Sequence, residues 1–198
     1  MILFNIVGLD RSCPMSPGLL VLSLCTLIPG DETVALKEVN LTLPRTVGDI
    51  ALKGKKDFDQ KELGYSVTFV SKVCHITLFV YDLGQKEIPN GKDNKPVMVQ
   101  LERSINDLKT LEKSGTYKNV QVMKGELPLP KTVLETFAAA GLTFDLDGRG
   151  CKSYVLLVGR EKYFLKVRIT QYVTDNQTND REVEAFMNAL VKAFAKSP

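Results

Sequence analysis

The stretch that decides the fold runs from Ser153 to Val173 and reads SYVLLVGREKYFLKVRITQYV. It begins with an apolar run at 153–158, and the residues GRE at 159–161 separate this run from the next. From Lys162 onward the side chains alternate with a period of two and are rich in β-branched and aromatic types, which is typical of a half-buried strand. Two strands joined by so short a connection predict an antiparallel hairpin.

The alternation also assigns the two faces of the second strand. Lys166 and Arg168 share one face, and the opposite face is mostly apolar. A slip of one residue would turn both cations into the core, so we expect a register that keeps them out of it. Two uses of this cationic pair remain open, namely the binding of an anion or ion pairs with carboxylates on a neighbouring strand.

A strongly amphipathic helix is predicted after this hairpin, close to the end of the chain. Its apolar residues are spaced at i, i+3, i+4, i+7, i+8 and i+11, which produces one continuous stripe. The stripe consists of Val183, Phe186, Met187, Leu190, Val191 and Phe194. A stripe of this width has to be buried, and the apolar face of the hairpin is the nearest surface that can cover it.

A second ribbon is predicted between Tyr65 and Asp82. Residues 65–69 alternate between apolar and polar types, and the run from His75 to the end of the ribbon, HITLFVYD, is apolar on both of its faces. A strand of the second kind is typically central and covered on both sides. We therefore expect a second hairpin that lies in the same layer as the first.

Between the two ribbons we predict a loop over 83–95 and then a helix with Pro96 in its first turn and Gly115 just past its end. The apolar stripe of this helix is predicted to be Met98, Leu101, Ile105, Leu108 and Leu111. Residues 132–140, TVLETFAAA, fit a helix and a strand equally well. The order of these elements predicts an α+β fold, with an antiparallel β-sheet layered with helices in a single domain over 31–198.

Residues 1–30 differ from the rest because Asp10 and Arg11 are their only charges. The apolar run GLLVLSLCTLI at 18–28 suits a secretory signal peptide, and a buried apolar N-terminal segment is the alternative. A start at Met1 or at Met15 fits this interpretation. We therefore expect a periplasmic or secreted protein with no stable membrane span in the mature chain, or a cytoplasmic protein if the segment is not a signal.

Charge excludes one class of partner. A net charge of +3 over 198 residues, with no basic stripe interleaved with aromatic residues, does not indicate a nucleic-acid-binding protein. The densest basic run, Lys53–Lys56, is followed by several acidic residues and is predicted to be a solvated loop. The expected partner is thus a protein or a small molecule of unknown identity.

Removal of a signal peptide would leave an even pair of cysteines, Cys74 and Cys151. Each lies at the predicted entrance to a strand. A disulfide between them is feasible if those strands are aligned neighbours, and two free buried thiols are the alternative. The spacing of the cysteines does not resemble a zinc site.

The remaining chemical candidates are few. His75 is the only histidine, but it adjoins Cys74 on a strand, so the two side chains are expected to point to opposite faces and not to form a dyad. The segment DLDG at Asp145–Gly148 provides only half of a calcium loop and is better explained as a polar turn. We therefore predict no catalytic residue, metal site or cofactor, and the ligand-binding residues remain unknown.

Three segments carry a resemblance to a known family: GYSVTFVSKVCHITLFVYDLG at Gly64–Gly84, the helix that follows it, and KYFLKVRITQYV with its closing helix. Together they resemble the Mog1/PsbP-like α/β/α sandwich proteins, including bacterial envelope proteins of DcrB type. The resemblance implies an exported, non-enzymatic accessory or binding protein of the cell envelope. A hydrolase with an unrecognised site and a cytosolic protein-interaction module remain as alternatives.

Overall fold

The computed structural model describes residues 32–173 and 178–196, so the expected signal peptide at 1–30 lies outside the described residues. An eight-stranded antiparallel sheet is the centre of the described chain, in the order β3-β4-β5-β6-β10-β9-β8-β7. Its strands are β3 (Thr46–Val47), β4 (Ile50–Asp57), β5 (Tyr65–Val70), β6 (Cys74–Tyr81), β7 (Lys118–Val122), β8 (Ala138–Leu146), β9 (Arg149–Arg160) and β10 (Tyr163–Tyr172).

Both predicted hairpins are confirmed, and they meet in the middle of this sheet. β5 pairs with β6, β9 pairs with β10, and β10 also pairs with β6, each time antiparallel. The turn of the second hairpin differs from the prediction. Arg160 pairs with Tyr163, so the turn consists of Glu161 and Lys162, which both have positive φ, and Gly159 belongs to the strand.

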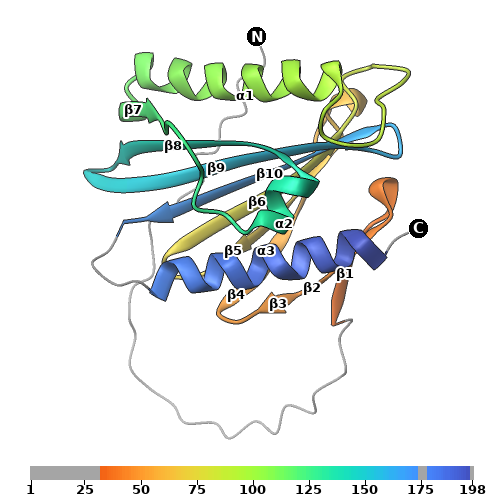
Figure 1. Cartoon of the computed structure of the whole chain (residues 1–198), viewed down its shortest axis with the longest axis horizontal. Helices are drawn as coiled ribbons and strands as arrows, with labels where there is room; N and C mark the ends of the chain where they lie inside the picture. Colours follow the sequence, from red (N-terminus) through yellow and green to blue (C-terminus); the bar gives the residue numbers. More distant parts are fainter. Residues whose placement is uncertain (1–31, 174–177, 197–198) are drawn as a thin grey trace, which may run out of the picture. The chain divides into compact units, whose positions relative to one another are not determined.

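Helices cover both faces of the sheet (Figure 1). α3 (Thr178–Lys196), the short α2 (Lys131–Thr136) and the two-stranded ribbon of β1 (Thr33–Leu36) and β2 (Leu41–Pro44) lie on one face, which we call the α3 face. α1 (Lys95–Lys113) lies on the other, the α1 face. Two short 3₁₀ helices, η1 (Lys37–Val39) and η2 (Lys61–Leu63), complete the described elements. The fold is therefore α+β, as expected.

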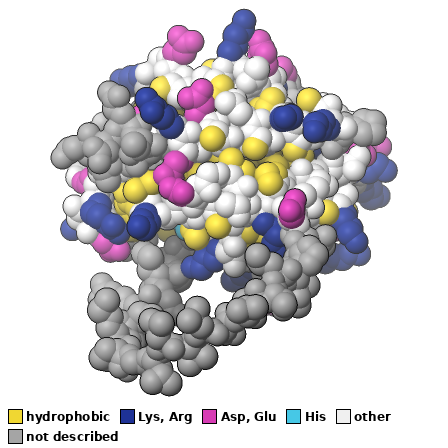
Figure 2. Space-filling model, turned by 90° about the horizontal axis from the view of Figure 1, so that it is seen from below, with side chains coloured by type: hydrophobic (Ala, Val, Ile, Leu, Met, Phe, Trp, Pro, Cys, Tyr) yellow, Lys and Arg dark blue, Asp and Glu magenta, His cyan; other side chains and the backbone are white. Residues whose placement is uncertain are grey.

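The main core lies on the α3 face. Phe186 and Leu190 of α3 are fully buried, and the ring of Phe186 meets the ring of Phe69 on β5 edge-on, with 5.1 Å between their centroids. Val183 and Met187 belong to the same cluster, which confirms the predicted stripe of the terminal helix. Figure 2 views this side of the molecule and shows hydrophobic side chains at the surface between charged ones.

The predicted stripe of α1 is confirmed for Leu101 and Leu108 and wrong for Met98. Met98 is 49% exposed, whereas Val97, Leu101 and Leu108 are buried together with the polar Gln100 and Ser104. The polar pair is tolerated because Gln100 Nε2 donates to the Tyr81 hydroxyl at 3.1 Å and the Ser104 hydroxyl donates to the Gln100 carbonyl at 2.9 Å. Buried polar groups with partners cost little, so the inner side of this helix is less apolar than its sequence pattern predicts.

Two further segments differ from expectation. The basic run at 53–56 is not a loop, because it lies within β4 and pairs with β5 across a register shift. Residues 132–140, for which helix and strand remained open, contain both: α2 ends at Thr136 and β8 begins at Ala138. The change occurs at Phe137, which is extended and buried and anchors the junction in the core.

Candidate functional site

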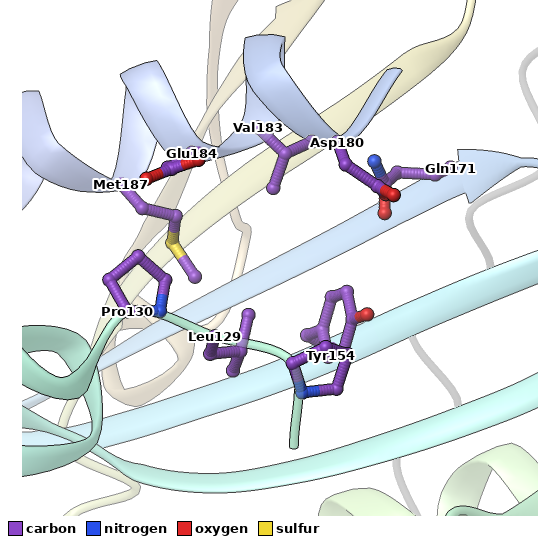
Figure 3. A pocket seen from close by; sticks show the side chains of 9 residues that line it. Leu129, Pro130, Tyr154, Gln171, Asp180, Val183, Glu184 and Met187 are labelled. Atoms are coloured by element: carbon purple, nitrogen blue, oxygen red, sulfur yellow. The ribbon is translucent and has the colours of Figure 1, made fainter. Parts of the chain in front are cut away.

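A pocket of about 270 Å³ lies on the α3 face, between α3 and the segment Pro128–Pro130 that precedes α2 (Figure 3). Tyr154 of β9 and Gln171 of β10 line it from the sheet. Val183 and Met187 line it from the helix. The pocket is therefore built by the segment 128–130, β9, β10 and α3.

Local sequence explains how the loop side of the pocket forms. Two prolines in three residues prevent 128–130 from continuing a helix or a sheet ladder, and α2 starts directly after Pro130. Gly141 on β8 lets the preceding segment approach the sheet, because a Cβ there would lie 2.6 Å from Met123 Sδ and 2.7 Å from Leu127 Cδ2. Met123 N–H also donates to the Gly141 carbonyl at 2.8 Å. The glycine thus places the loop against the pocket floor.

Tyr154 is the most informative group of the pocket. Its side chain is 97% buried by surface area, since only 3% is exposed, and its hydroxyl makes no hydrogen bond within the described residues. Burial, followed by the nearby Asp180 carboxylate, raises the pKa of this phenol. The hydroxyl therefore stays protonated at neutral pH and can donate one hydrogen bond and accept another. A pocket-lining hydroxyl that lacks a partner among the described residues is suited to form a hydrogen bond with a ligand.

Two carboxylates line the same pocket as this hydroxyl. Asp180 and Glu184 lie four residues apart on α3, so they share one side of the helix, and both line the pocket. Neither forms an ion pair within the described part of the chain. Figure 3 shows Asp180 and Gln171 at one end of the pocket, and Glu184 beside Met187 with Pro130 at the other. The Asp180 end is thus polar and anionic, and the Met187 end is more apolar, with Glu184 beside it.

This arrangement favours a ligand that carries both a cationic group and an apolar group. A cationic group on the ligand can pair with the two carboxylates. Among the described residues, the pocket lining contains no lysine or arginine that would repel this group. The apolar end can cover a small hydrocarbon group. At about 270 Å³ the pocket is close to the lower limit of roughly 300–1,000 Å³ for pockets that bind drug-sized ligands, so it suits a small molecule or a single side chain.

His75 lies outside this pocket, on the α1 face of β6, with its ring Nδ1 3.5 Å from the Thr77 hydroxyl. Its pKa is lowered by burial first and by Lys53 and Arg168 second. Cys74 belongs to the core of the opposite face, so the prediction that the two neighbours do not form a dyad is confirmed.

The cysteines are two free buried thiols, the second of the two alternatives that the sequence left open. The strands that carry them are not neighbours, because β10 lies between β6 and β9. Cys74 pairs with Gln171 and Cys151 with Tyr172, consecutive residues whose side chains point to opposite faces. A disulfide would have to pass through the sheet.

The other candidates have structural roles. Lys166 is only 9% exposed on the α1 face, and its neighbours across the ladder are Phe79 and Leu157 instead of carboxylates. Its ammonium lies 4.7 Å from the centre of the Phe79 ring. Arg168 donates to the Tyr117 hydroxyl at 2.9 Å. The prediction that these cations avoid the core is wrong for Lys166, because α1 covers the face that the pattern left to solvent.

The segment DLDG forms the turn between β8 and β9, as predicted. Asp145 Oδ2 accepts a hydrogen bond of 2.6 Å from Asn119 Nδ2, and Asp147 has φ of 51° in the turn. Within residues 32–173 and 178–196, no three His, Cys, Asp or Glu side chains gather as a metal site would require. None of the described helices is long and apolar enough to cross a membrane.

No family model matches the chain, and no curated protein matches it.

The pocket residues were missed by sequence reasoning, although one signal was available. Gln171 continues the apolar face of β10 after Ile169, and Tyr154 interrupts the apolar run of β9 with a hydroxyl. A polar residue on an otherwise apolar face indicates the position at which the strand extends past the hydrophobic core.

Proposed function

We propose that this protein is a non-enzymatic binding protein whose pocket takes a small organic molecule with an apolar body and a cationic group. The ammonium pairs with Asp180 and Glu184, and the Tyr154 hydroxyl provides a hydrogen bond. The apolar body lies against Met187 and Pro130. The observation that carries the proposal is the Tyr154 hydroxyl, which has no hydrogen-bond partner among the described residues, in a pocket that two carboxylates without ion pairs and apolar side chains also line.

Binding is a better use of these groups than hydrolysis. A phenol whose pKa is raised by burial is a poor nucleophile and a poor general base at neutral pH, because those roles need a group that loses its proton near the working pH. The same shift keeps the hydroxyl available as a hydrogen-bond donor. The chemistry of Tyr154 therefore supports recognition.

We also propose that the protein is exported and acts in the cell envelope, as expected from the apolar segment at 18–28. A relationship to the Mog1/PsbP-like sandwich proteins belongs to the same proposal. Helices on both faces of a mostly antiparallel sheet are compatible with it. Fractionation of the native host, followed by determination of the mature amino terminus, tests this part of the proposal. A chain that stays in the cytoplasm with its first residues intact contradicts it.

The pocket is tested with phenethylamine, which has an aromatic body and one ammonium, and with phenethyl alcohol as its neutral counterpart. In a titration followed by ¹H–¹⁵N NMR we expect the amine to shift the resonances of Tyr154, Gln171 and Val183. A Kd on the order of 1 mM is reasonable for so small a ligand. The alcohol should bind more weakly, by about twofold to fivefold, since it lacks the charge.

Asp180→Asn removes one carboxylate with little change in volume and should weaken the amine without affecting the alcohol. Asp59→Asn serves as the control, because it makes the same change in net charge at an exposed position outside the pocket. The proposal is wrong if the amine and the alcohol bind equally, or if both variants weaken the amine to the same extent.

A further inference from the structure

A second, shallower hollow of about 450 Å³ lies on the ends of β7, β8, β9 and β10. Its lining combines the polar Asn119, Gln121, Thr143, Asp145 and Lys152 with apolar residues that include Phe144 and Val173. The register of the sheet shows that it adjoins the first pocket. Gln171 pairs with Lys152, which pairs with Thr143, which pairs with Gln121.

This row of four side chains crosses four strands on the α3 face. Gln171, its first member, also lines the first pocket. Tyr154 is two residues from Lys152 on β9, so it occupies the next row of the same face. The two hollows thus share a floor, and among the described residues α3 lines only the first of them.

The row begins with the buried Gln171 amide, which already has a partner within the chain, and continues with the Lys152 ammonium, the Thr143 hydroxyl and the Gln121 amide. Amides and hydroxyls both donate and accept hydrogen bonds, as peptide groups of a ligand require. Lys152 forms no ion pair or hydrogen bond within the described residues. Asp145, the acidic residue of this hollow, already accepts a hydrogen bond from Asn119. One unpaired positive charge therefore lies beside the anionic end of the first pocket.

The length of the row bounds the ligand. Neighbouring strands lie about 4.8 Å apart, so the three spacings from Gln171 to Gln121 amount to roughly 14 Å. An extended peptide advances about 3.4 Å per residue, so about four residues match the row. A chain much longer than this would pass the edge strand β7 and leave the sheet.

We propose that the pocket and the polar row together bind a short linear peptide of up to about four residues with both ends free. Its amino terminus pairs with Asp180 and Glu184, and its first side chain fills the apolar pocket. Its backbone follows the polar row past Lys152, and the Lys152 ammonium, on its flexible four-carbon stem, attracts the carboxylate at the far end. This proposal rests on the function proposed above and adds the class of ligand.

The test uses leucyl-trialanine in three forms: with both ends free, with the amino terminus acetylated, and with the carboxyl terminus amidated. Binding to the full chain is followed by ¹H–¹⁵N NMR. Acetylation should weaken binding about fivefold or more, because it removes the cation, and amidation should weaken it about twofold to fivefold. The resonances of Thr143 and Gln121 should shift with the peptide but not with phenethylamine.

Lys152→Met removes the ammonium and keeps the aliphatic stem. In this variant the free and amidated peptides should bind equally, whereas phenethylamine should bind as it does to the unchanged chain. If amidation has no effect on the unchanged chain, or if it has the same effect in Lys152→Met, the peptide proposal fails although the amine pocket stands. If neither phenethylamine nor the peptide shifts the pocket resonances, both proposals fail.

Discussion

Gly159 provides the sharpest test of how the α1 face is assembled. The loop that precedes α1 lies across β9 at this residue, and two hydrogen bonds join them: Gly91 N–H donates to the Gly159 carbonyl at 2.9 Å, and Gly159 N–H donates to the Gly91 carbonyl at 3.0 Å. A Cβ at position 159 would lie 2.1 Å from the Pro89 carbonyl oxygen and 3.1 Å from Ile88 Cγ2. The glycine is needed because the backbone of the loop occupies the space of a side chain.

Gly159→Ala should therefore destabilise the protein by displacing this loop. The Pro89 carbonyl has to move by more than an ångström to reach ordinary contact distance, which disrupts the two hydrogen bonds at a cost of about 1 kcal/mol each. Ile88, now only 3% exposed, loses part of a burial worth about 1.5–3 kcal/mol. Alanine also lowers the conformational entropy of the unfolded chain, which offsets about 0.4–1 kcal/mol of this destabilisation. The expected loss in the free energy of unfolding is about 2–3 kcal/mol.

Urea unfolding of both chains measures this loss. Gly54→Ala is the matched control, since Gly54 also lies in a strand but a Cβ there meets nothing within 4 Å, and its unfolding free energy should change by less than about 0.5 kcal/mol. Hydrogen exchange at Gly91 should accelerate in Gly159→Ala alone. If the two alanine variants are equally stable, the loop does not constrain this strand and the reasoning is wrong.

The remaining predictions concern groups buried on the two faces of the sheet. Burial lowers the pKa of Lys166 to about 8, with Arg168 adding to the shift and Asp107 opposing it, so between pH 8 and about 10.5 the unfolded chain binds a proton that the folded chain lacks. The free energy of unfolding should therefore rise with pH across that window, by at most about 3 kcal/mol from this group. In urea unfolding, Lys166→Met should exceed the unchanged chain in stability by the largest amount at pH 7 and by less toward pH 10. A difference between the two chains that does not change with pH contradicts the assignment. Burial raises the pKa of the Cys74 thiol to about 12, and Cys151 is also buried, so N-ethylmaleimide should label these two cysteines only as urea unfolds the chain. A peptide map of the native protein in which Cys74 and Cys151 are joined by a disulfide would refute the strand order.

Local periodicity was sufficient to predict both central hairpins and the terminal helix. Each of them repeats its pattern over many residues, and the pattern of α3 from Val183 to Phe194 has a single face to bury. The same logic placed Leu101 and Leu108 of α1 correctly but missed Gln100 and Ser104. These take inner positions because the Gln100 amide donates to the Tyr81 hydroxyl and the Ser104 hydroxyl donates to the Gln100 backbone carbonyl. Hydrophobicity alone cannot show that a polar residue has found a buried partner.

Lys166 illustrates a second limit. An alternating strand predicts one covered and one wet face, but this strand is central in a sheet that carries helices on both sides. The ammonium therefore lies under a second layer, against Phe79, in an environment that the alternation cannot reveal. The turn was displaced for a related reason. Gly159 suggested a bend, yet its role is to let the loop at 88–91 cross the strand.

The candidate site could not be predicted because it depends on pairing between distant strands. Tyr154 and Gln171 become neighbours of Asp180 only once β9 lies beside β10 and α3 returns across them. The outward row from Gln171 to Gln121 needs two more pairings. Each polar residue by itself has an ordinary explanation at a strand end, and only the register brings them into one surface.

The position at which α3 begins connects the fold to this surface. The helix covers the apolar rows of the α3 face, including Ile169 and Leu156, and these residues are fully buried. Asp180, in the first turn of α3, lines the same pocket as Gln171. At Gln171 and its partner Lys152 the side chains on the α3 face of the sheet change from apolar to polar. A face left uncovered and apolar would invite aggregation, whereas a polar row at the edge of a core is stable in water and available for hydrogen bonds. The binding surface is thus the part of the sheet that the terminal helix does not need for its own burial.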